Sequence, residues 1–173
     1  IIALLSGSRY QEVKRVLPVM LKAASHFPDY QFVWAGVSSL DKSLYKKILG
    51  NSDVFLIENQ TYELLQNSSA AVVTSGTATL ETALLTVPEV VCYKATGFSY
   101  FLAKWMIKVK FISLVNLVMD KEVVKELIQG EMTEENIVKE LELLLHNSKR
   151  QRILLEDYEE LKDRLGSAGA SEK

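Results

Sequence analysis

The sequence predicts an α/β fold: a Rossmann-like doubly wound parallel sheet covered by helices on both faces, followed by C-terminal helices. Short continuous apolar runs alternate with helical patterns through most of the chain, as expected for strands buried on both faces of a parallel sheet. The chain has 173 residues, enough for one domain whose core needs no disulfide. Ligands of such sheets bind beyond the carboxyl ends of the strands, so function is expected in the loops that follow them.

The expected strands are the apolar runs at residues 1–5, 31–36, 54–57, 70–74, 89–93 and 111–114. Helical spacing predicts one helix that begins at Ser8, further helices at 41–49 and 62–66, and another after Gly76. Ser8 is the expected cap of the first helix because Gln11 lies at capping-box spacing from it. Pro18 falls inside that helix, where it should kink the helix or cost roughly 3 kcal/mol.

The last third of the chain is expected to be helical. Glu122, Glu126 and Gln129 recur at helical spacing and predict a helix with one polar face. An amphipathic helix follows, with apolar residues Ile137, Leu141, Leu144 and Leu145. Ser148 opens another helix with capping-box spacing to Gln151, and its apolar residues are Leu154, Tyr158, Leu161 and Leu165. We therefore expect a Rossmann-like domain at 1–147, a C-terminal helix at 148–165 and a flexible tail at 166–173.

The run Thr74-Ser75-Gly76-Thr77-Ala78-Thr79-Leu80-Glu81 has the order strand, glycine-containing turn, helix N-terminus. The first turn of a helix leaves backbone N–H groups unpaired and carries a partial positive charge, so phosphate binds well there. Gly76 lets the backbone approach an anion, while Ser75, Thr77 and Thr79 offer hydroxyl donors. Glu81, about one turn beyond Thr77, is placed to accept hydrogen bonds from sugar hydroxyls. The run is typical of a nucleotide site, although an ordinary Ser/Thr-capped helix has the same composition.

A second anion-receptive turn, Ser6-Gly7-Ser8-Arg9, follows the first expected strand. Gly7 gives access to the backbone, and Arg9 adds a cation that can hold phosphate oxygens bidentately. Two such turns at one sheet edge suit a diphosphate. An exposed arginine after a Ser-capped helix start is the alternative interpretation.

Several other classes of function find no support. The dinucleotide fingerprint G-x-G-x-x-G and the P-loop are absent, which argues against a dehydrogenase or an NTPase. His26 and His146 have no partner at ligand spacing, so we expect neither a metal site nor a Ser/His/Asp hydrolase. The net charge of −2 gives no electrostatic reason to expect a nucleic-acid partner.

Residues 94–110 combine large apolar side chains with Lys94, Lys104, Lys108 and Lys110 and contain no acid. That pairing is typical of segments at a membrane surface, and a core helix with solvated lysines is the other interpretation. Asn116 follows the expected strand at 111–114, where its amide either closes a turn or reaches a ligand at the same sheet edge.

The combined pattern resembles the lipid-A-disaccharide synthase family in order and spacing across nearly the whole chain. It consists of Ser6-Gly7-Ser8-Arg9 with Glu12, the turn at 75–81, Pro88 with Tyr93-Lys94, and the segments 113–117 and 122–129. The matching part is the C-terminal, nucleotide-sugar-binding half of this GT-B glycosyltransferase of family 19. The resemblance implies a hexosyltransferase of lipid A and lipopolysaccharide biosynthesis. Such an enzyme joins UDP-2,3-diacylglucosamine to 2,3-diacylglucosamine 1-phosphate with inversion, releases UDP, and needs neither metal nor cofactor, because the UDP-sugar is a substrate.

The resemblance also implies roles for individual residues. Arg9 and the turn Ser75-Gly76-Thr77, with Gly7 and Ser8, would bind the diphosphate and stabilise the charge on the leaving UDP. Glu81 would bind the ribose, and Asn116 and Gln129 would lie near the reacting sugar or its phosphates. Arg9 and Asn116 are the catalytic candidates. Val115 stands where the family usually has proline, which weakens the assignment of Asn116.

The family has a second, acceptor-binding domain that would precede Ile1 and carry the general base. We therefore expect this chain alone to be inactive and to bind UDP weakly. The whole enzyme would be peripheral on the cytoplasmic face of the inner membrane of a Gram-negative bacterium. The C-terminal helices would pack either on that other domain or on a second subunit, forming a homodimer through Leu154, Tyr158, Leu161 and Leu165.

Two alternatives remain open from the sequence. One is another GT-B UDP-sugar enzyme, such as a UDP-N-acetylglucosamine epimerase or a peptidoglycan-precursor transferase, which tends to have Gly-rich turns where this chain has Ser75-Gly76-Thr77. The other is a non-catalytic nucleotide-binding or membrane-surface module, which would bind liposomes and give no heat with UDP.

Overall fold

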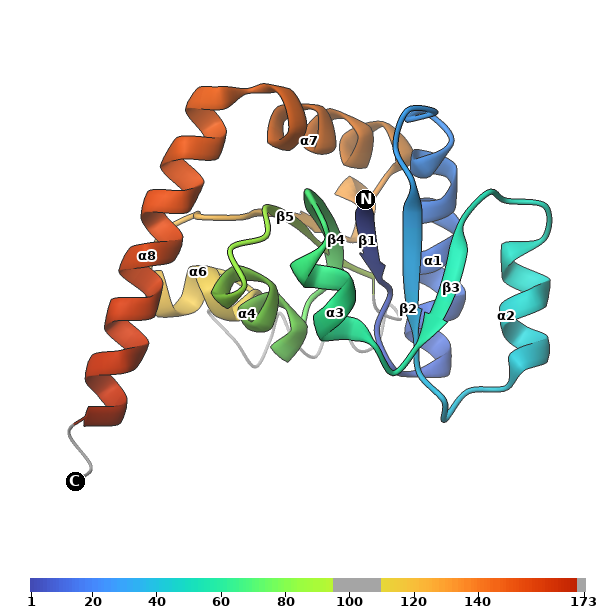
Figure 1. The fold of residues 1–173 in the computed structure, drawn as a ribbon, viewed down its shortest axis with the longest axis horizontal. Helices are drawn as coiled ribbons and strands as arrows, with labels where there is room; N and C mark the ends of the chain where they lie inside the picture. The colour runs from blue at the N-terminus through green and yellow to red at the C-terminus, as the bar shows by residue number, and fades with distance from the viewer. Residues whose placement is uncertain (95–109, 171–173) are drawn as a thin grey trace.

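The computed structural model describes residues 1–94 and 110–170. Six parallel strands form one sheet with helices on both sides (Figure 1). The strand order is β3-β2-β1-β4-β5-β6. This order changes direction between β1 and β4, which makes the carboxyl ends of those two strands the topological switch point of a doubly wound sheet. The predicted fold class is therefore confirmed.

The strands are β1 (Ile2–Leu5), β2 (Phe32–Gly36), β3 (Phe55–Glu58), β4 (Ala70–Thr74), β5 (Glu89–Tyr93) and β6 (Lys125–Ile128). The helices are α1 (Tyr10–Ala24), α2 (Lys42–Leu49), α3 (Thr61–Gln66), α4 (Thr77–Leu84), α6 (Leu114–Met119), α7 (Glu134–His146) and α8 (Ser148–Ala170), with a 3₁₀ turn η1 at Gln129–Glu131. β1, β2, β4 and β5 are buried along almost their whole length, as their continuous apolar runs predicted.

The sixth strand does not lie where the sequence predicted it. Residues 111–114 were expected to form a strand, but Ser113 instead caps α6, and its side chain accepts a hydrogen bond from the Asn116 backbone N–H at 3.3 Å. The strand β6 lies at Lys125–Ile128, where helical spacing of polar residues had predicted a helix. Glu126 is 8% exposed in this strand. A buried carboxylate that is satisfied by hydrogen bonds gave the segment a misleadingly polar pattern.

Helix α1 begins one residue later than predicted. Its cap is Arg9, not Ser8, and the Glu12 carboxylate, not Gln11, accepts a hydrogen bond from the Arg9 backbone N–H at 3.3 Å. The helix runs continuously through Pro18 to Ala24. Glu12 was the better partner because a carboxylate also pairs with the guanidinium of Arg9.

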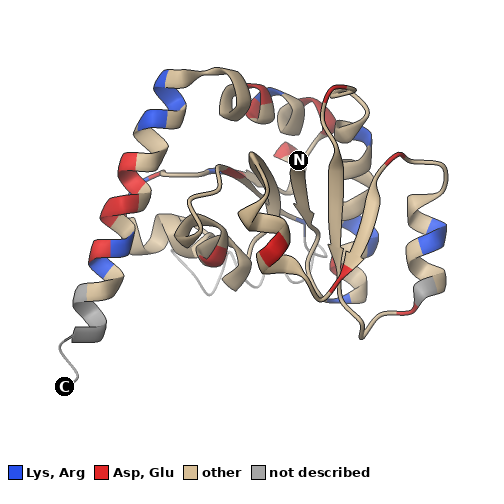
Figure 2. Cartoon of the chain, in the orientation of Figure 1, with Lys and Arg blue, Asp and Glu red and all other residues tan. Residues whose placement is uncertain are grey.

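Helix α8 extends beyond the predicted end at residue 165 and reaches Ala170 (Figure 1). Its start also differs from the prediction, because the Asn147 side chain, not Ser148, accepts from the Arg150 backbone N–H at 2.9 Å. The Gln151 side chain donates instead to the backbone oxygens of Leu144 and Leu145, at the end of α7. Charges of both signs lie along α8 (Figure 2).

The apolar face of α8 packs on this chain's own core. Leu154, Tyr158 and Leu161 are each 0% exposed, and the half-buried Leu165 packs against the same cluster. Burying side chains of this size contributes about 1.5–3 kcal/mol each. The expectation that these residues are partly without a partner in this chain is wrong, and dimerisation stays a prediction.

Polar contacts fix α8 to the segment between α6 and β6. Arg150 donates to the Val123 backbone oxygen at 2.8 Å, and the Lys121 ammonium lies 2.7 Å from Asp157 and 3.1 Å from Glu160. Within the described residues, no helix is both long and apolar enough to span a bilayer. Residues 95–109, most of the segment for which we considered a membrane-surface role, lie outside the described residues.

Candidate functional site

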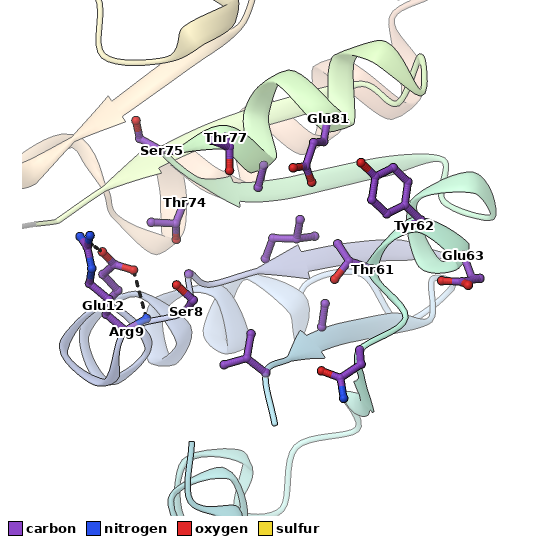
Figure 3. A pocket seen from close by; sticks show the side chains of 17 residues that line it. Ser8, Arg9, Glu12, Thr61, Tyr62, Glu63, Thr74, Ser75, Thr77 and Glu81 are labelled. Carbon is purple, nitrogen blue, oxygen red and sulfur yellow. Dashed lines mark hydrogen bonds and ion pairs between the residues drawn. The ribbon is translucent and has the colours of Figure 1, made fainter. Parts of the chain in front are cut away.

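A pocket of about 660 Å³ opens at the carboxyl ends of β1, β2 and β4 (Figure 3). This volume falls within the usual range of roughly 300–1,000 Å³ for small-molecule sites. The lining residues come from the ends of neighbouring strands and from the loops and helix starts that follow them: Leu5, Gly7, Ser8, Arg9, Glu12, Ala35, Val37, Asn59, Thr61, Tyr62, Glu63, Thr74, Ser75, Gly76, Thr77, Ala78 and Glu81. The pocket therefore lies at the switch point of the sheet, where ligands of doubly wound folds bind.

The two turns that the sequence singled out lie together in this pocket. Gly7, Ser8 and Arg9 follow β1, while Ser75, Gly76, Thr77 and Glu81 follow β4, and all of them line it. Because β1 and β4 are adjacent and parallel, with Leu5 opposite Val73, their carboxyl ends meet at one edge. In Figure 3, Arg9 and Glu12 lie at one end of the pocket, whereas Glu81, Tyr62 and Glu63 lie at the other.

The turn after β1 requires glycine at position 7. The φ angle of Gly7 is +90°, a region that side-chain-bearing residues rarely adopt. A Cβ at this position would lie 2.4 Å from Oε2 of Glu12. The preceding residue, Ser6, is fully buried and accepts a hydrogen bond from the Trp34 indole at 2.8 Å. The backbone entering the turn is thus anchored to β2.

Arg9 provides the cation of this turn, and Glu12 holds it. The guanidinium lies 3.2 Å from the Glu12 carboxylate, with exposed side-chain fractions of 84% for Arg9 and 32% for Glu12. An ion pair as exposed as this contributes between about 0 and 1 kcal/mol. Exchanging it for a diphosphate, which offers more acceptor oxygens, therefore costs little.

The turn after β4 uses part of its donor set internally. The Ser75 hydroxyl donates to the Ile112 backbone oxygen at 2.9 Å, and its N–H donates to the Cys92 oxygen at 2.9 Å. The Thr79 hydroxyl donates to the Gly76 oxygen at 2.8 Å, and Thr79 is fully buried. The expectation that Thr79 supplies a donor to a ligand is therefore wrong. Ser75 lines the pocket, but its hydroxyl proton is already donated to the Ile112 oxygen.

The remaining donors surround Gly76. Among the described residues, no acceptor is found for the backbone N–H groups of Gly76, Thr77 and Ala78 or for the Thr77 hydroxyl. A Cβ at Gly76 would meet only the Thr74 oxygen, at 4.0 Å, so the space beside this residue is open. These groups at the start of α4 form an anion-receptive surface that faces the pocket.

Glu81 lies one turn further along α4. Its side chain is half-buried and lines the pocket, and within the described part of the chain no donor reaches its carboxylate. It is therefore available to accept hydrogen bonds from a ligand. Its separation from Arg9 across the pocket places the acceptor and the cation at different parts of one ligand (Figure 3).

No individual residue on the other side of the pocket was assigned from the sequence. Ala35 lies near the end of β2 and Val37 follows it, while Asn59 lies between β3 and α3, and Thr61 and Tyr62 begin α3. Tyr45 fixes this side, because its hydroxyl contacts both the Val37 N–H and the Val37 oxygen. The loops at 36–40 and 57–61 were recognisable as strand ends, but only the strand order places them beside β1.

Asn116 and Gln129 do not line the pocket. Asn116 is fully buried, and its amide hydrogen-bonds to the Val124 oxygen, Glu126, and the N–H groups of Val123 and Val124, at 2.8–2.9 Å. Gln129 has a φ angle of +53°, and its buried Nε2 has no hydrogen-bond partner in the described part of the chain. The roles expected of both residues at the reacting sugar stay predictions. In residues 1–94 and 110–170, no cluster of three His, Cys, Asp or Glu side chains could hold a metal ion.

Comparison with known proteins adds a family match. A family model described as lipid-A-disaccharide synthetase matches residues 1–172. The lipid-A-disaccharide synthase of Syntrophus aciditrophicus is 42% identical over 179 aligned positions, which cover 99% of this chain and 47% of that protein. The one from Myxococcus xanthus is 38% identical over 176 positions, covering 98% of this chain and 46% of that protein. The chain spans about half the length of these curated relatives.

Solved structures show the same fold. The spinosyn rhamnosyltransferase SpnG, complexed with spinosyn aglycone, matches with a TM-score of 0.65 at 12% identity, over 94% of this chain and 42% of that one. At such identity the likeness shows the fold alone, the Rossmann-like α/β fold that the sequence predicted.

Proposed function

The chain belongs to the lipid-A-disaccharide synthetase family, and from this premise we propose that its pocket binds the UDP part of UDP-2,3-diacylglucosamine. The observation that carries the proposal is the meeting of the two anion-receptive turns and Glu81 in one pocket at the sheet's switch point. The chain would then be the donor-binding half of an inverting glycosyltransferase. The other UDP-sugar enzymes that we considered share the fold, and the family match separates this chain from them.

In this proposal the diphosphate lies between the two turns. The N–H groups at the start of α4 that have no acceptor in residues 1–94 and 110–170 donate to it from one side, together with the Thr77 hydroxyl. The Arg9 guanidinium, released from its exposed pair with Glu12, approaches from the other side. Glu81 accepts hydrogen bonds from the ribose hydroxyls. The base occupies the side formed by Val37, Asn59 and Tyr62.

Transfer proceeds by attack of an acceptor hydroxyl on the anomeric carbon of the donor sugar. The bond from this carbon to the UDP oxygen breaks, and UDP leaves with the electron pair, while a general base takes the hydroxyl proton. Arg9 and the amides of α4 stabilise the negative charge that develops on UDP. Gln129 keeps its predicted place near the sugar, whereas Asn116, whose amide is fully hydrogen-bonded within the chain, would act on the reaction through its neighbours. The acceptor, 2,3-diacylglucosamine 1-phosphate, binds on a separate N-terminal domain.

The remaining expectations for the whole protein belong to the same proposal. The enzyme works at the cytoplasmic face of the inner membrane and uses residues 94–110 at the lipid surface. A homodimer would have to use surfaces other than the buried face of α8. The 173 residues span about half the length of the curated relatives, and we expect them to bind UDP weakly without turning over.

Titration calorimetry of this chain with UDP tests the proposal. We expect saturable binding that is much weaker when uridine replaces UDP, because the pocket's donors hold the diphosphate. Binding of uridine as strong as that of UDP would contradict the assignment of the two turns. Absence of UDP binding, together with binding to liposomes, would favour a membrane-surface module instead.

A further inference from the structure

We propose that Glu126 is a positioning residue for the diphosphate turn, and that it acts through residues 112–113 and Ser75. This inference rests on the proposed function, because it concerns the turn that would hold the diphosphate of UDP. Glu126 lies on β6, outside the pocket, and is 8% exposed. In the described part of the chain no cation pairs with its carboxylate, so hydrogen bonds alone compensate its burial.

The Glu126 carboxylate organises the segment that precedes α6. It accepts from the Ile112 backbone N–H at 2.9 Å, from the Ser113 N–H at 2.9 Å and from the Ser113 hydroxyl at 2.8 Å. The Asn116 amide donates to it at 2.9 Å. The groups that bond to this carboxylate within the described residues are all donors, so a carboxylate, which only accepts, satisfies them, whereas a glutamine amide would not.

Residues 112–113 connect this node to the pocket. The carbonyl oxygen of Ile112, whose N–H is bound by Glu126, accepts the Ser75 hydroxyl proton at 2.9 Å. Ser75 directly precedes Gly76, whose N–H group and those of the next two residues have no acceptor among the described residues. The orientation of these donors therefore depends on Ile112, and the place of Ile112 depends on Glu126.

Asn116 connects the same node to the rest of β6. Its side-chain oxygen accepts from the Val123 and Val124 N–H groups, while its NH₂ group donates to the Val124 oxygen and to Glu126. All four hydrogen-bonding positions of the amide are occupied. Asn116 thus supports the turn from a distance, and its effect on the reaction is that of a positioning residue.

A double-mutant cycle on UDP affinity tests the coupling. We expect Glu126→Gln and Ser75→Ala each to lower UDP affinity on the order of tenfold. The double variant should bind UDP as tightly as the single variant with the lower affinity. Glu122→Gln is the control, because Glu122 is 56% exposed and pairs only with Lys125 among the described residues. Additive losses, or a lower melting temperature with unchanged UDP affinity, would overturn the proposal.

Hydrogen exchange of the ligand-free protein separates this inference from the proposed function. The Ser75 and Thr79 amides, which bond to the Cys92 and Gly76 oxygens, should exchange faster in Glu126→Gln and in Ser75→Ala, but not in Glu122→Gln. If the wild-type protein fails to bind UDP, the proposed function fails, and exchange still decides whether Glu126 holds the turn. Unchanged exchange in Ser75→Ala, which leaves the buried node intact, would refute the coupling even if Glu126→Gln does not fold.

Discussion

The carboxylate of Glu12 accepts hydrogen bonds from both the backbone N–H and the guanidinium of Arg9, at 3.3 and 3.2 Å. One acid therefore both starts helix α1 and holds the cation that we assign to the diphosphate. Because the pair is largely exposed, it restrains Arg9 weakly, and the guanidinium can move to a ligand with a denser negative charge.

Removal of Arg9 should weaken binding of UDP more than binding of uridine. A hydrogen bond to a charged group is worth about 1.5–3 kcal/mol, so Arg9→Ala should lower UDP affinity by roughly tenfold or more. Arg152→Ala is the matched control, because Arg152 is 72% exposed and lies on α8, away from the pocket. Calorimetry with both ligands measures the effect. Equal losses for UDP and uridine would place Arg9 elsewhere than at the diphosphate.

Glu81 should determine whether the site distinguishes ribose from deoxyribose. We expect the wild-type protein to bind UDP more tightly than 2′-deoxy-UDP, by about 1.5–3 kcal/mol for a hydrogen bond to a carboxylate. Glu81→Ala should bind the two nucleotides equally. Its melting temperature should hardly change, because no donor within the described residues depends on this carboxylate. A variant that retains the preference for ribose would remove Glu81 from the sugar.

Gly7 and Gly50 both have positive φ angles, and replacing each with alanine separates the cost of backbone strain from the cost of steric overlap. Gly50→Ala introduces a Cβ with nothing within 4 Å at φ +53° and ψ −121°, so only the strained backbone is penalised, by about 1–3 kcal/mol. Gly7→Ala meets a comparable backbone penalty at φ +90° and in addition displaces Glu12. Denaturant unfolding should therefore show the larger loss for Gly7→Ala, and UDP affinity should fall only in that variant. Equal losses of stability would mean that Glu12 moves aside freely.

Glu89 should make the protein less stable as the pH rises. Burial raises the pKa of this carboxyl well above its ordinary value of 4.5, and in the described structure neither oxygen has a hydrogen-bond partner. Below the pKa of the unfolded chain both states carry the proton, so the contribution is constant. Between that pKa and the raised one, only the folded state keeps the proton, and stability falls by about 1.4 kcal/mol per pH unit.

Glu89→Gln removes this titration while keeping the shape of the side chain. Urea unfolding across this pH range should show a shallower pH dependence for the variant and a higher stability than the wild type at alkaline pH. If the stability of both proteins depended on pH in the same way, titration of Glu89 would not be the cause.

The sequence predicted the strands that are apolar throughout and missed the one that is not. Lys125 and Glu126 occupy β6, where the hydrogen bonds that satisfy Glu126 come from residues 112–116 and leave no local pattern. Likewise, the Ser75 hydroxyl donates its hydrogen bond to the backbone oxygen of Ile112, 37 positions away in the sequence. Both turns at the switch point were predictable, because glycine with hydroxyls at a strand end has a local cause. The loop that holds Asn59 was also expected at the ligand-binding edge, but only the order of the strands brings it and Tyr62, at the start of α3, to this pocket.

Because the Trp34 indole donates a hydrogen bond to Ser6 beside the pocket, the fluorescence of Trp34 should report ligand binding. Trp34 is fully buried, and its ring stacks edge-on against Tyr45, which in turn holds Val37 on the pocket wall. A ligand that shifts either loop changes the surroundings of this fluorophore. The other tryptophan, Trp105, lies outside the described residues, and a Trp105→Phe background leaves the emission of Trp34 alone to follow occupancy.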